Sequence, residues 1–101
     1  MYKRQALDGV EVTDLTPDIR QQYNVQRDVS GALVSSVDED SNSAKAELRQ
    51  GDVILEINHQ PVHNADEAVD LSKNAKGRRV LLKIWRDGST FFLTVDNQKQ
   101  K

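Results

Sequence analysis

The sequence has no cysteine among its 101 residues. Disulfide bonds, thiolate metal sites and a cysteine nucleophile are therefore excluded, while the redox compartment stays open because a cysteine-free chain suits any compartment. Aromatic residues are also scarce, at 5% of the chain. A chain of this length folds as one domain with one core, and without covalent cross-links its stability has to come from side-chain packing.

Charge is not concentrated anywhere in the chain. The 14 basic and 16 acidic residues are interleaved and give a net charge of −2, so no surface is expected that follows a phosphate backbone, and nucleic acid is excluded as a partner. No run of about 18 apolar residues is present, so membrane insertion is not expected. The first residues lack the apolar stretch of a secretion signal. We expect a fragment whose targeting segment, if its parent is exported, lies upstream.

Local signals predict an alternation of short strands and helices. Thr16 before Pro17 is a helix start, Asn64 is the cap of another helix, and Ser43 is expected to cap a short third one. Gly51 with Asp52 indicates a helix stop and tight turn before an apolar run. The predicted elements are a strand at 7–13, a helix at 17–23, a strand at 31–37, a helix at 44–49, a strand at 53–57, a turn at 58–61, a helix at 65–75 and a C-terminal hairpin.

Asp87-Gly88 is the strongest turn signal, because a two-residue hairpin turn needs positive φ at both positions. Placing Arg86 opposite Ser89 then fixes the register of the two strands. The face directed at the core pairs apolar residues with each other: Ile84 with Phe91, Leu82 with Leu93 and Val80 with Val95. The opposite face of the hairpin mixes polar and apolar residues, and we expect Trp85 and Phe92 to be exposed there.

This order of elements predicts an α+β domain that is mostly β. The expected architecture is a small, partly open antiparallel β-barrel or sandwich of five to six strands, capped by two to three helices. The domain is expected to span residues 7–96, with an N-terminal extension at 1–6 and a flexible tail at 97–101.

Several stretches carry a family resemblance. Residues 48–62 resemble the most recognisable part of PDZ domains, in which a leucine and a basic residue precede Gly-Asp, a buried strand and an Asn-containing turn. Leu7-Asp8-Gly9-Val10 resembles the carboxylate-binding loop of Do-type (HtrA, DegP-like) serine proteases, and Gly77 with residues 80–88 is similar to the end of bacterial PDZ domains. The inserted helix at 17–23 is similar to the second, C-terminal PDZ domain of such proteins.

The resemblance implies a PDZ-like accessory domain without catalytic residues or cofactors of its own. Its parent would be a serine endopeptidase of the periplasm or cell envelope. The implied partners are peptide or unfolded-protein segments, together with the protease domain and a neighbouring PDZ domain of the parent chain. One departure is Asn42-Ser43-Ala44, where the family has Ser-Pro-Ala.

Peptide binding by strand addition needs an unpaired strand edge, a groove beside it and a turn rich in N–H donors. The small residues on one face of the 65–75 helix are expected to leave room for aliphatic or aromatic ligand side chains. Asp8 would repel a terminal carboxylate by about 1 kcal/mol. The expected peptide-binding residues are Leu7, Asp8, Gly9, Val10, Glu11, Val12, Thr13, Ala65, Ala68, Leu71 and Ser72. The competing interpretation is that the alanines, Leu7 and Val10 are ordinary core positions.

Catalytic and metal sites are not expected. His59 and His63 have a spacing that suits zinc on a helix, but Pro61 between them argues against a helix. No serine lies in a sharp glycine-flanked elbow, and the acidic run at 38–40 lacks the spacing of a calcium loop.

Two functions remain open from the residues. In the first, the domain recognises C-terminal or extended apolar peptide segments and serves or regulates an attached protease. In the second, it is a structural module that docks against other domains or subunits through an apolar patch at Trp85 and Phe92, and binds no free peptide.

Overall fold

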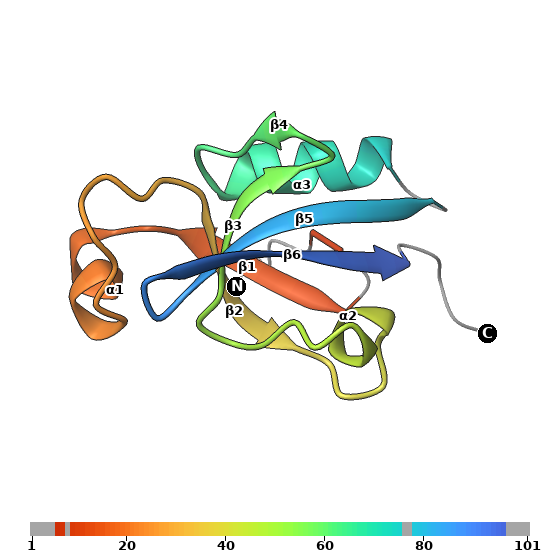
Figure 1. Ribbon diagram of the computed structural model, residues 1–101, viewed down its shortest axis with the longest axis horizontal. Coiled ribbons are helices and arrows are strands. Elements are labelled where there is room, and N and C mark those ends of the chain that lie inside the picture. The colour runs from red at the N-terminus through yellow and green to blue at the C-terminus, as the bar shows by residue number, and fades with distance from the viewer. Residues whose placement is uncertain (1–5, 8, 76–77, 97–101) are drawn as a thin grey trace.

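The computed structural model describes residues 6–7, 9–75 and 78–96 and folds them around one six-stranded sheet (Figure 1). The strands are β1 (Val10–Asp14), β2 (Ala32–Val37), β3 (Val53–Ile57), β4 (Gln60–Pro61), β5 (Arg79–Arg86) and β6 (Ser89–Asp96), and the helices are α1 (Pro17–Gln22), α2 (Asn42–Lys45) and α3 (Ala65–Asn74). The strand order is β1-β2-β3-β5-β6 with β4 on β3, and all these pairs are antiparallel. Within these ranges, no helix is long and apolar enough to cross a membrane.

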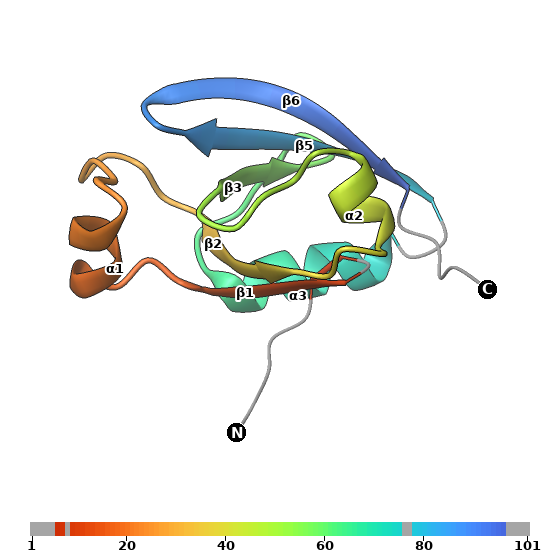
Figure 2. The same ribbon diagram turned by 90° about the horizontal axis from the view of Figure 1, so that it is seen from below.

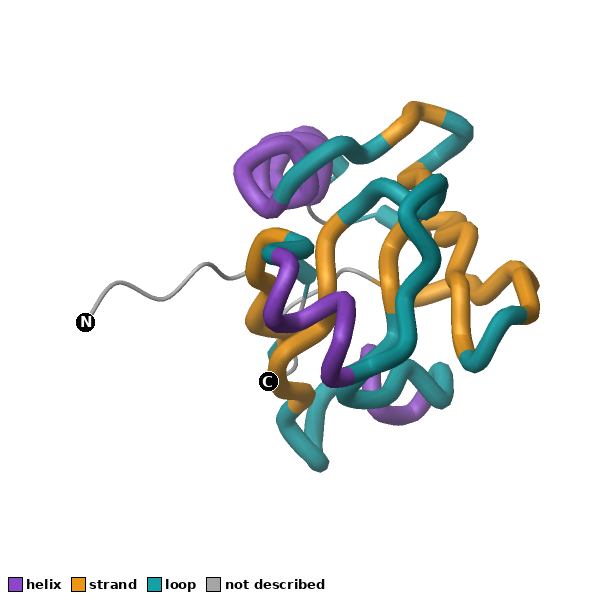
Figure 3. Tube along the Cα trace, turned by 90° about the vertical axis from the view of Figure 1, so that its left-hand side faces the viewer, coloured by secondary structure: helices purple, strands orange, loops and turns teal. Residues whose placement is uncertain are grey.

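The helices cover different sides of the sheet (Figure 3). α3 lies against β1, β2 and β3, on the side away from the β5–β6 hairpin (Figure 2). α2 contacts β6, and the Asn42 side chain donates a 3.0 Å hydrogen bond to the carbonyl of Asp96. The expected mostly-β, partly open antiparallel architecture is confirmed, and the sheet does not close because β1 and β6 stand at opposite ends of its strand order.

The hairpin register is as predicted, from Arg86 opposite Ser89 to Val80 opposite Val95. Asp87 and Gly88 have φ values of 49° and 84°, as a two-residue turn of this kind requires. Val80, Leu82 and Ile84 consequently point into the main core and are fully buried. Burial of one such side chain stabilises the fold by about 1.5–3 kcal/mol.

The expected exposure of Trp85 is wrong. Trp85 is only 4% exposed and forms a second cluster of buried residues with Val25, Leu33 and Val53. Ile19 and Tyr23, from α1 and its end, pack against the same cluster. The outer face of the sheet is therefore covered at this point by a segment distant in sequence. Phe92, farther along the hairpin, is 56% exposed as expected.

α1 begins as predicted, with the Thr16 hydroxyl accepting a 3.3 Å hydrogen bond from the N–H of Ile19 and Pro17 in the first turn. The prediction for the next helix is wrong in its cap and length. Ser41 is the cap of α2, and its hydroxyl accepts from the N–H of Ala44, whereas Ser43 is buried inside the helix. α2 ends at Lys45 because Glu47 adopts a positive φ of 73°, so residues 46–49 are not helical.

β3 and α3 lie where the sequence predicts. The turn expected at 58–61 is shorter, because Asn58 and His59 have positive φ and the chain returns at once as the two-residue β4. Asn64 caps α3 by accepting a 2.9 Å hydrogen bond from the N–H of Glu67. The Glu67 carboxylate in turn accepts from the N–H of His63, so both ends of this short segment are fixed.

Candidate functional site

Among the residues that the structure describes, β1 has a strand partner on one side only. β2 pairs with one edge of β1, and α3 lies along the neighbouring side of the molecule (Figure 2). The carbonyl of Gly9 accepts a 2.8 Å hydrogen bond from Asp38 and that of Glu11 accepts from the Ser35 hydroxyl at 3.1 Å. Backbone groups alternate along an antiparallel strand, so those of Val10 and Val12 point away from β2. The outward groups of Val10 bond to Leu7 and Ala6 in the preceding loop, so Val12 is where β1 offers the backbone groups that strand addition requires.

α3 is held close to this edge. The Asp14 carboxylate at the end of β1 accepts a 2.8 Å hydrogen bond from the N–H of Ala65, the first residue of α3. Ala65 and Ala68 are fully buried, and the Ser72 hydroxyl is satisfied by the carbonyl of Ala68 at 2.6 Å. These residues are spaced by three and four positions and so share one face of the helix. Their small size permits the close approach of α3 to the sheet.

The structure brings the expected strand and helix residues together on adjoining elements. Leu7, Val10 and Val12 have buried side chains in the main core, and only their backbone can meet a ligand. Ala65 and Ala68 are core residues as well, in agreement with the competing interpretation of the sequence. The half-buried members of the set are Gly9, Glu11, Thr13 and Leu71, while Asp8 lies outside the described residues. A role in ligand binding stays a prediction for all of them.

The loop before β1 is fixed by its own hydrogen bonds. The N–H of Val10 donates to the carbonyl of Leu7 at 3.2 Å, and the carbonyl of Val10 accepts from the N–H of Ala6 at 3.0 Å. Gly9 has a φ of +71°, and a Cβ at this position would clash with the side chain of Ser41. Glycine is therefore required here for two reasons. Other residues rarely adopt this positive φ, and any side chain would clash with the turn before α2.

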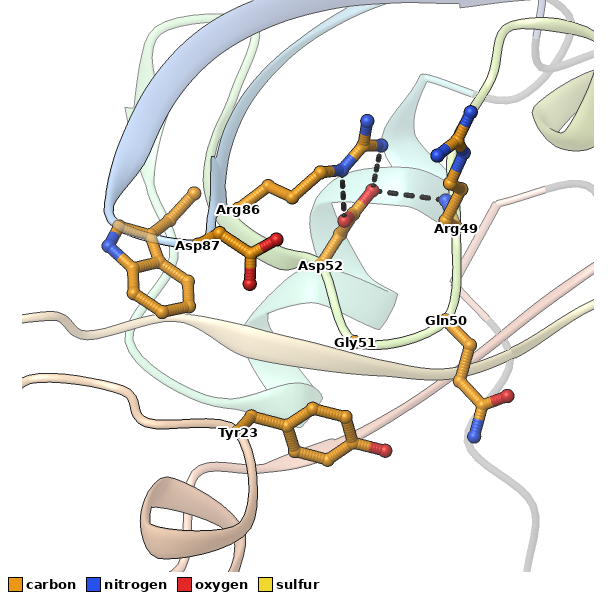
Figure 4. Close-up of a pocket in the computed structure, with 8 residues that line it drawn as sticks. Tyr23, Arg49, Gln50, Gly51, Asp52, Arg86 and Asp87 are labelled. Atoms are coloured by element: carbon orange, nitrogen blue, oxygen red, sulfur yellow. Dashed lines mark hydrogen bonds and ion pairs between the residues drawn. The ribbon is translucent and has the colours of Figure 1, made fainter.

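A second feature is the ion pair between Asp52 and Arg86, which sequence reasoning did not identify. Figure 4 shows the Arg86 guanidinium facing the carboxylate of Asp52, with Nε–Oδ1 at 2.7 Å and Nη2–Oδ2 at 2.6 Å. Oδ2 also accepts from the N–H of Arg49 at 3.0 Å, and Asp52 is 1% exposed. These hydrogen bonds raise the pKa of Arg86 above its usual value. The pair joins the turn before β3 to the end of β5.

This ion pair borders a shallow hollow of about 200 Å³ (Figure 4). The hydroxyl end of Tyr23 and the amide of Gln50 lie on one side of it, with the guanidinium groups on the other. Both oxygens of the Asp52 carboxylate accept hydrogen bonds, so this buried acid of the hollow is held in place by Arg86 and the backbone of Arg49. The full lining is Tyr23, Arg49, Gln50, Gly51, Asp52, Trp85, Arg86 and Asp87.

No sequence signal could have selected Arg86 as the partner of Asp52. A buried carboxylate after glycine calls for a cation, but 14 basic residues compete for that role and the correct one is 34 positions away. In the part of the chain that the structure describes, no three side chains of the metal-binding types lie close enough together to hold a metal ion. The Nδ1 of His63 instead lies 2.7 Å from the Oε1 of Glu67. The hydrogen bonds from His63 lower the pKa of Glu67.

Comparison with known proteins identifies a matching domain family and relatives that align with most of this chain. A PDZ domain family model matches residues 33–86. A probable periplasmic serine endoprotease, DegP-like, of Chlamydia muridarum is 40% identical over 76 residues, which are 75% of this chain and 15% of the relative. The protein of the same description from Chlamydia trachomatis is 32% identical over 90% of this chain and 18% of the relative. The chain thus spans less than a fifth of the length of these curated relatives.

Solved structures agree with these matches. The HtrA-type protease AlgW with a decapeptide has a TM-score of 0.77 at 26% identity, over 94% of this chain and 30% of AlgW. The HtrA3 PDZ domain bound to a phage-derived ligand, FGRWV, has a TM-score of 0.73 over 87% of this chain and 80% of that domain; at 22% identity it shows the fold. The assignment to a second PDZ domain stays a prediction. The chain therefore belongs to the PDZ domain family and is homologous to DegP- and HtrA-type serine proteases, as an accessory domain and not the catalytic one.

Proposed function

We propose that this domain binds extended apolar peptide segments by adding them as a strand to β1, on the side that faces α3. The observation that carries the proposal is the edge of β1 that pairs with no described strand, where the backbone groups of Val12 are directed away from β2. Two relatives of known structure support it, since AlgW was solved with a decapeptide and the HtrA3 domain with the ligand FGRWV.

Strand addition provides affinity through the backbone and specificity through alternate side chains. The N–H and C=O of Val12 would pair with one ligand residue, and the side chains beside that residue would alternate between the α3 side and solvent. We expect micromolar affinity, about −8 kcal/mol, because ordering a flexible peptide offsets much of the gain from short pairing.

The parent of this domain is proposed to be a periplasmic serine endoprotease, by analogy with the names of its DegP-like relatives. In that setting the domain would deliver unfolded segments to an attached protease domain or regulate it. Within such a parent, this domain would contact the protease domain and a further PDZ domain of the same chain.

The test is an N-methyl scan of one apolar heptapeptide, measured by fluorescence anisotropy. In an added strand, every second peptide N–H points toward β1 and the others point away. Methylation at two adjacent positions is therefore expected to give opposite results: about a tenfold loss of affinity at one and little change at the next. Equal losses at all positions, or none at any, would contradict strand addition.

A docking module without peptide binding is the second candidate, and one observation still favours it. Phe92 is 56% exposed on β6, the other end of the sheet. The expected apolar patch is nevertheless reduced by half, since Trp85 is buried. If Phe92→Ser left peptide affinity intact but abolished the contact of this domain with the rest of its parent, the domain would have both functions, with peptide binding at β1 and docking at β6.

A further inference from the structure

We propose that β6 pairs with the β6 strand of a second copy of this chain, antiparallel and centred on Phe92, and so joins two domains into a weak symmetric dimer. This inference does not depend on peptide binding at β1. β6 stands at the end of the strand order, and among the described residues it pairs with β5 alone. Figure 2 shows β6 along one border of the molecule, with β5 beside it.

The hairpin turn determines which backbone groups of β6 face outward. In a two-residue hairpin the residues beside the turn, here Arg86 and Ser89, exchange both hydrogen bonds, and bonded and non-bonded pairs then alternate along the strands. Three residues therefore have their N–H and C=O directed away from β5: Thr90, Phe92 and Thr94. Asp96 continues this series, and its carbonyl accepts the hydrogen bond from the Asn42 side chain. The edge open to a further strand thus lies between the turn and Asp96.

A second β6 strand fits this edge in one register better than in any other. With Phe92 opposite its counterpart, Thr90 lies opposite Thr94, and all three outward-facing residues form bonded pairs with about six hydrogen bonds. A shift by one residue would place outward-facing groups opposite inward-facing ones. A shift by two would bring in either Gly88 of the turn or the carbonyl of Asp96, which is already bonded to α2.

The side chains along this edge also suit a second copy. Phe92 is 56% exposed and would lie against its counterpart, while the exposed Thr90 would face Thr94 on the same side of the two strands. On the opposite side, Phe91 and Leu93 are only partly buried, and Phe91 of one copy would lie opposite Leu93 of the other. Aromatic and threonine pairs of this kind stabilise antiparallel strands. The pairing would cover apolar surface that the hairpin leaves exposed.

Charge does not oppose the pairing, although the contact is small. Residues 89–95 include no charged residue and no proline, which proteins commonly place on strand edges to prevent pairing. At the two ends, Asp87 follows Arg86 in sequence and Asp96 lies opposite Arg79, so each acid has a basic residue of its own hairpin beside it. One added strand buries much less than the about 1,600 Å² of a standard interface, so we expect a dissociation constant of about 0.1–1 mM.

The cysteine-free chain allows a direct test by disulfide cross-linking. Phe92→Cys places two thiols opposite each other, with a Cα separation of about 5.5 Å that a disulfide can span. Thr94→Cys is the matched control, because it is exposed on the same side of the same strand but would lie about 13 Å along the strand from its counterpart. Under mild oxidation, Phe92→Cys should form the covalent dimer about tenfold faster than Thr94→Cys. Equal rates would overturn the inference.

Charge substitutions test the two-fold centre without a covalent bond. Phe92→Lys and Phe92→Glu each place like charges opposite each other and should abolish association in sedimentation equilibrium, whereas an equimolar mixture of the two should associate about as well as the wild type. Gln22→Lys, the same charge change at an exposed position of α1, should leave association unchanged. Circular dichroism checks that each variant is folded. The inference fails if the mixture associates no better than either variant alone. It also fails if the wild-type domain stays monomeric at millimolar concentration, which would leave the edge to another segment of a parent chain.

Discussion

The two ends of the sheet differ in what surrounds them. β6 belongs to a hairpin whose eight pairs follow each other without interruption, and its partner β5 is its neighbour in sequence. β1 pairs with β2 through an irregular register, lies near α3, and is preceded by a loop that makes hydrogen bonds with its first residue. The β6 edge is aligned by pairing with its neighbour in sequence, whereas the β1 edge is built mainly by contacts from segments distant in sequence. Under the proposed function, β1 is the edge that a ligand strand would complete.

The largest expected effect contrasts the two aromatic residues of the hairpin. Trp85→Ala should destabilise the fold by about 3–5 kcal/mol, because it empties the cluster beneath α1. Phe92→Ala, on the same face of the hairpin but at an exposed position, should change stability by less than about 0.5 kcal/mol. Urea denaturation followed by circular dichroism measures both. Similar effects of the two substitutions would show that the outer face is not divided as described.

The ion pair at the end of β5 is the next test. Asp52→Asn should cost about 3 kcal/mol in urea denaturation, because it leaves the Arg86 guanidinium beside a neutral, buried amide. Asp87→Asn is the matched control in the exposed turn next to it, where asparagine also tolerates positive φ, and it should be neutral. Equal stability of Asp52→Asn and the wild type would mean that this pair does not join the hairpin to the turn before β3.

Two glycines of positive φ compare the loop at β1 with the turn at β6. Gly9→Val should destabilise the domain by about 1–3 kcal/mol and weaken peptide binding severalfold, since it adds a clash with Ser41 to the backbone strain. Gly88→Val carries the strain alone, because nothing lies within 4 Å of a Cβ there, and it should leave peptide affinity unchanged. If peptide affinity fell equally in both variants, the loop before β1 would not be part of the binding site.

The smallest effect concerns the start of α3. Hydrogen bonds from His63 hold the pKa of Glu67 below its ordinary value of 4.5, so the ionised side chain adds stability above pH 4.5 that is lost as the pH falls through the lowered pKa. Glu67→Gln should therefore be slightly less stable than the wild type at pH 6, and the difference should be smaller at pH 3. Thermal unfolding at the two pH values measures the difference, and a gap that widens in acid would reverse the sign of this account.

Local signals predicted those parts of the fold that local interactions determine. The hairpin register follows from Asp87-Gly88 and alternating residues, and the starts of α1 and α3 follow from Thr16 and Asn64. The cap of α2 was misplaced because Ser41 and Ser43 offer the same chemistry two positions apart, and only the positive φ at Glu47 determines where that helix ends.

Non-local packing accounts for what the sequence did not reveal. Trp85 is buried by α1 and Asp52 by Arg86, and neither contact leaves a periodic signal in the chain. The strand and helix expected at the candidate site do adjoin each other as β1 and α3, and a role of their residues in binding stays a prediction. The extent to which Ala65 and Ala68 are buried depends on how closely α3 approaches β1.

The central claim is that peptide adds to β1 and not to β6. Amide hydrogen exchange of the domain, measured by NMR with and without a saturating apolar peptide, tests it residue by residue. The N–H of Val12 should exchange at least tenfold more slowly in the complex, while residues 89–96 of β6 keep their rates. Slower exchange along β6 with no change at Val12 would contradict the account and assign peptide binding to the opposite end of the sheet.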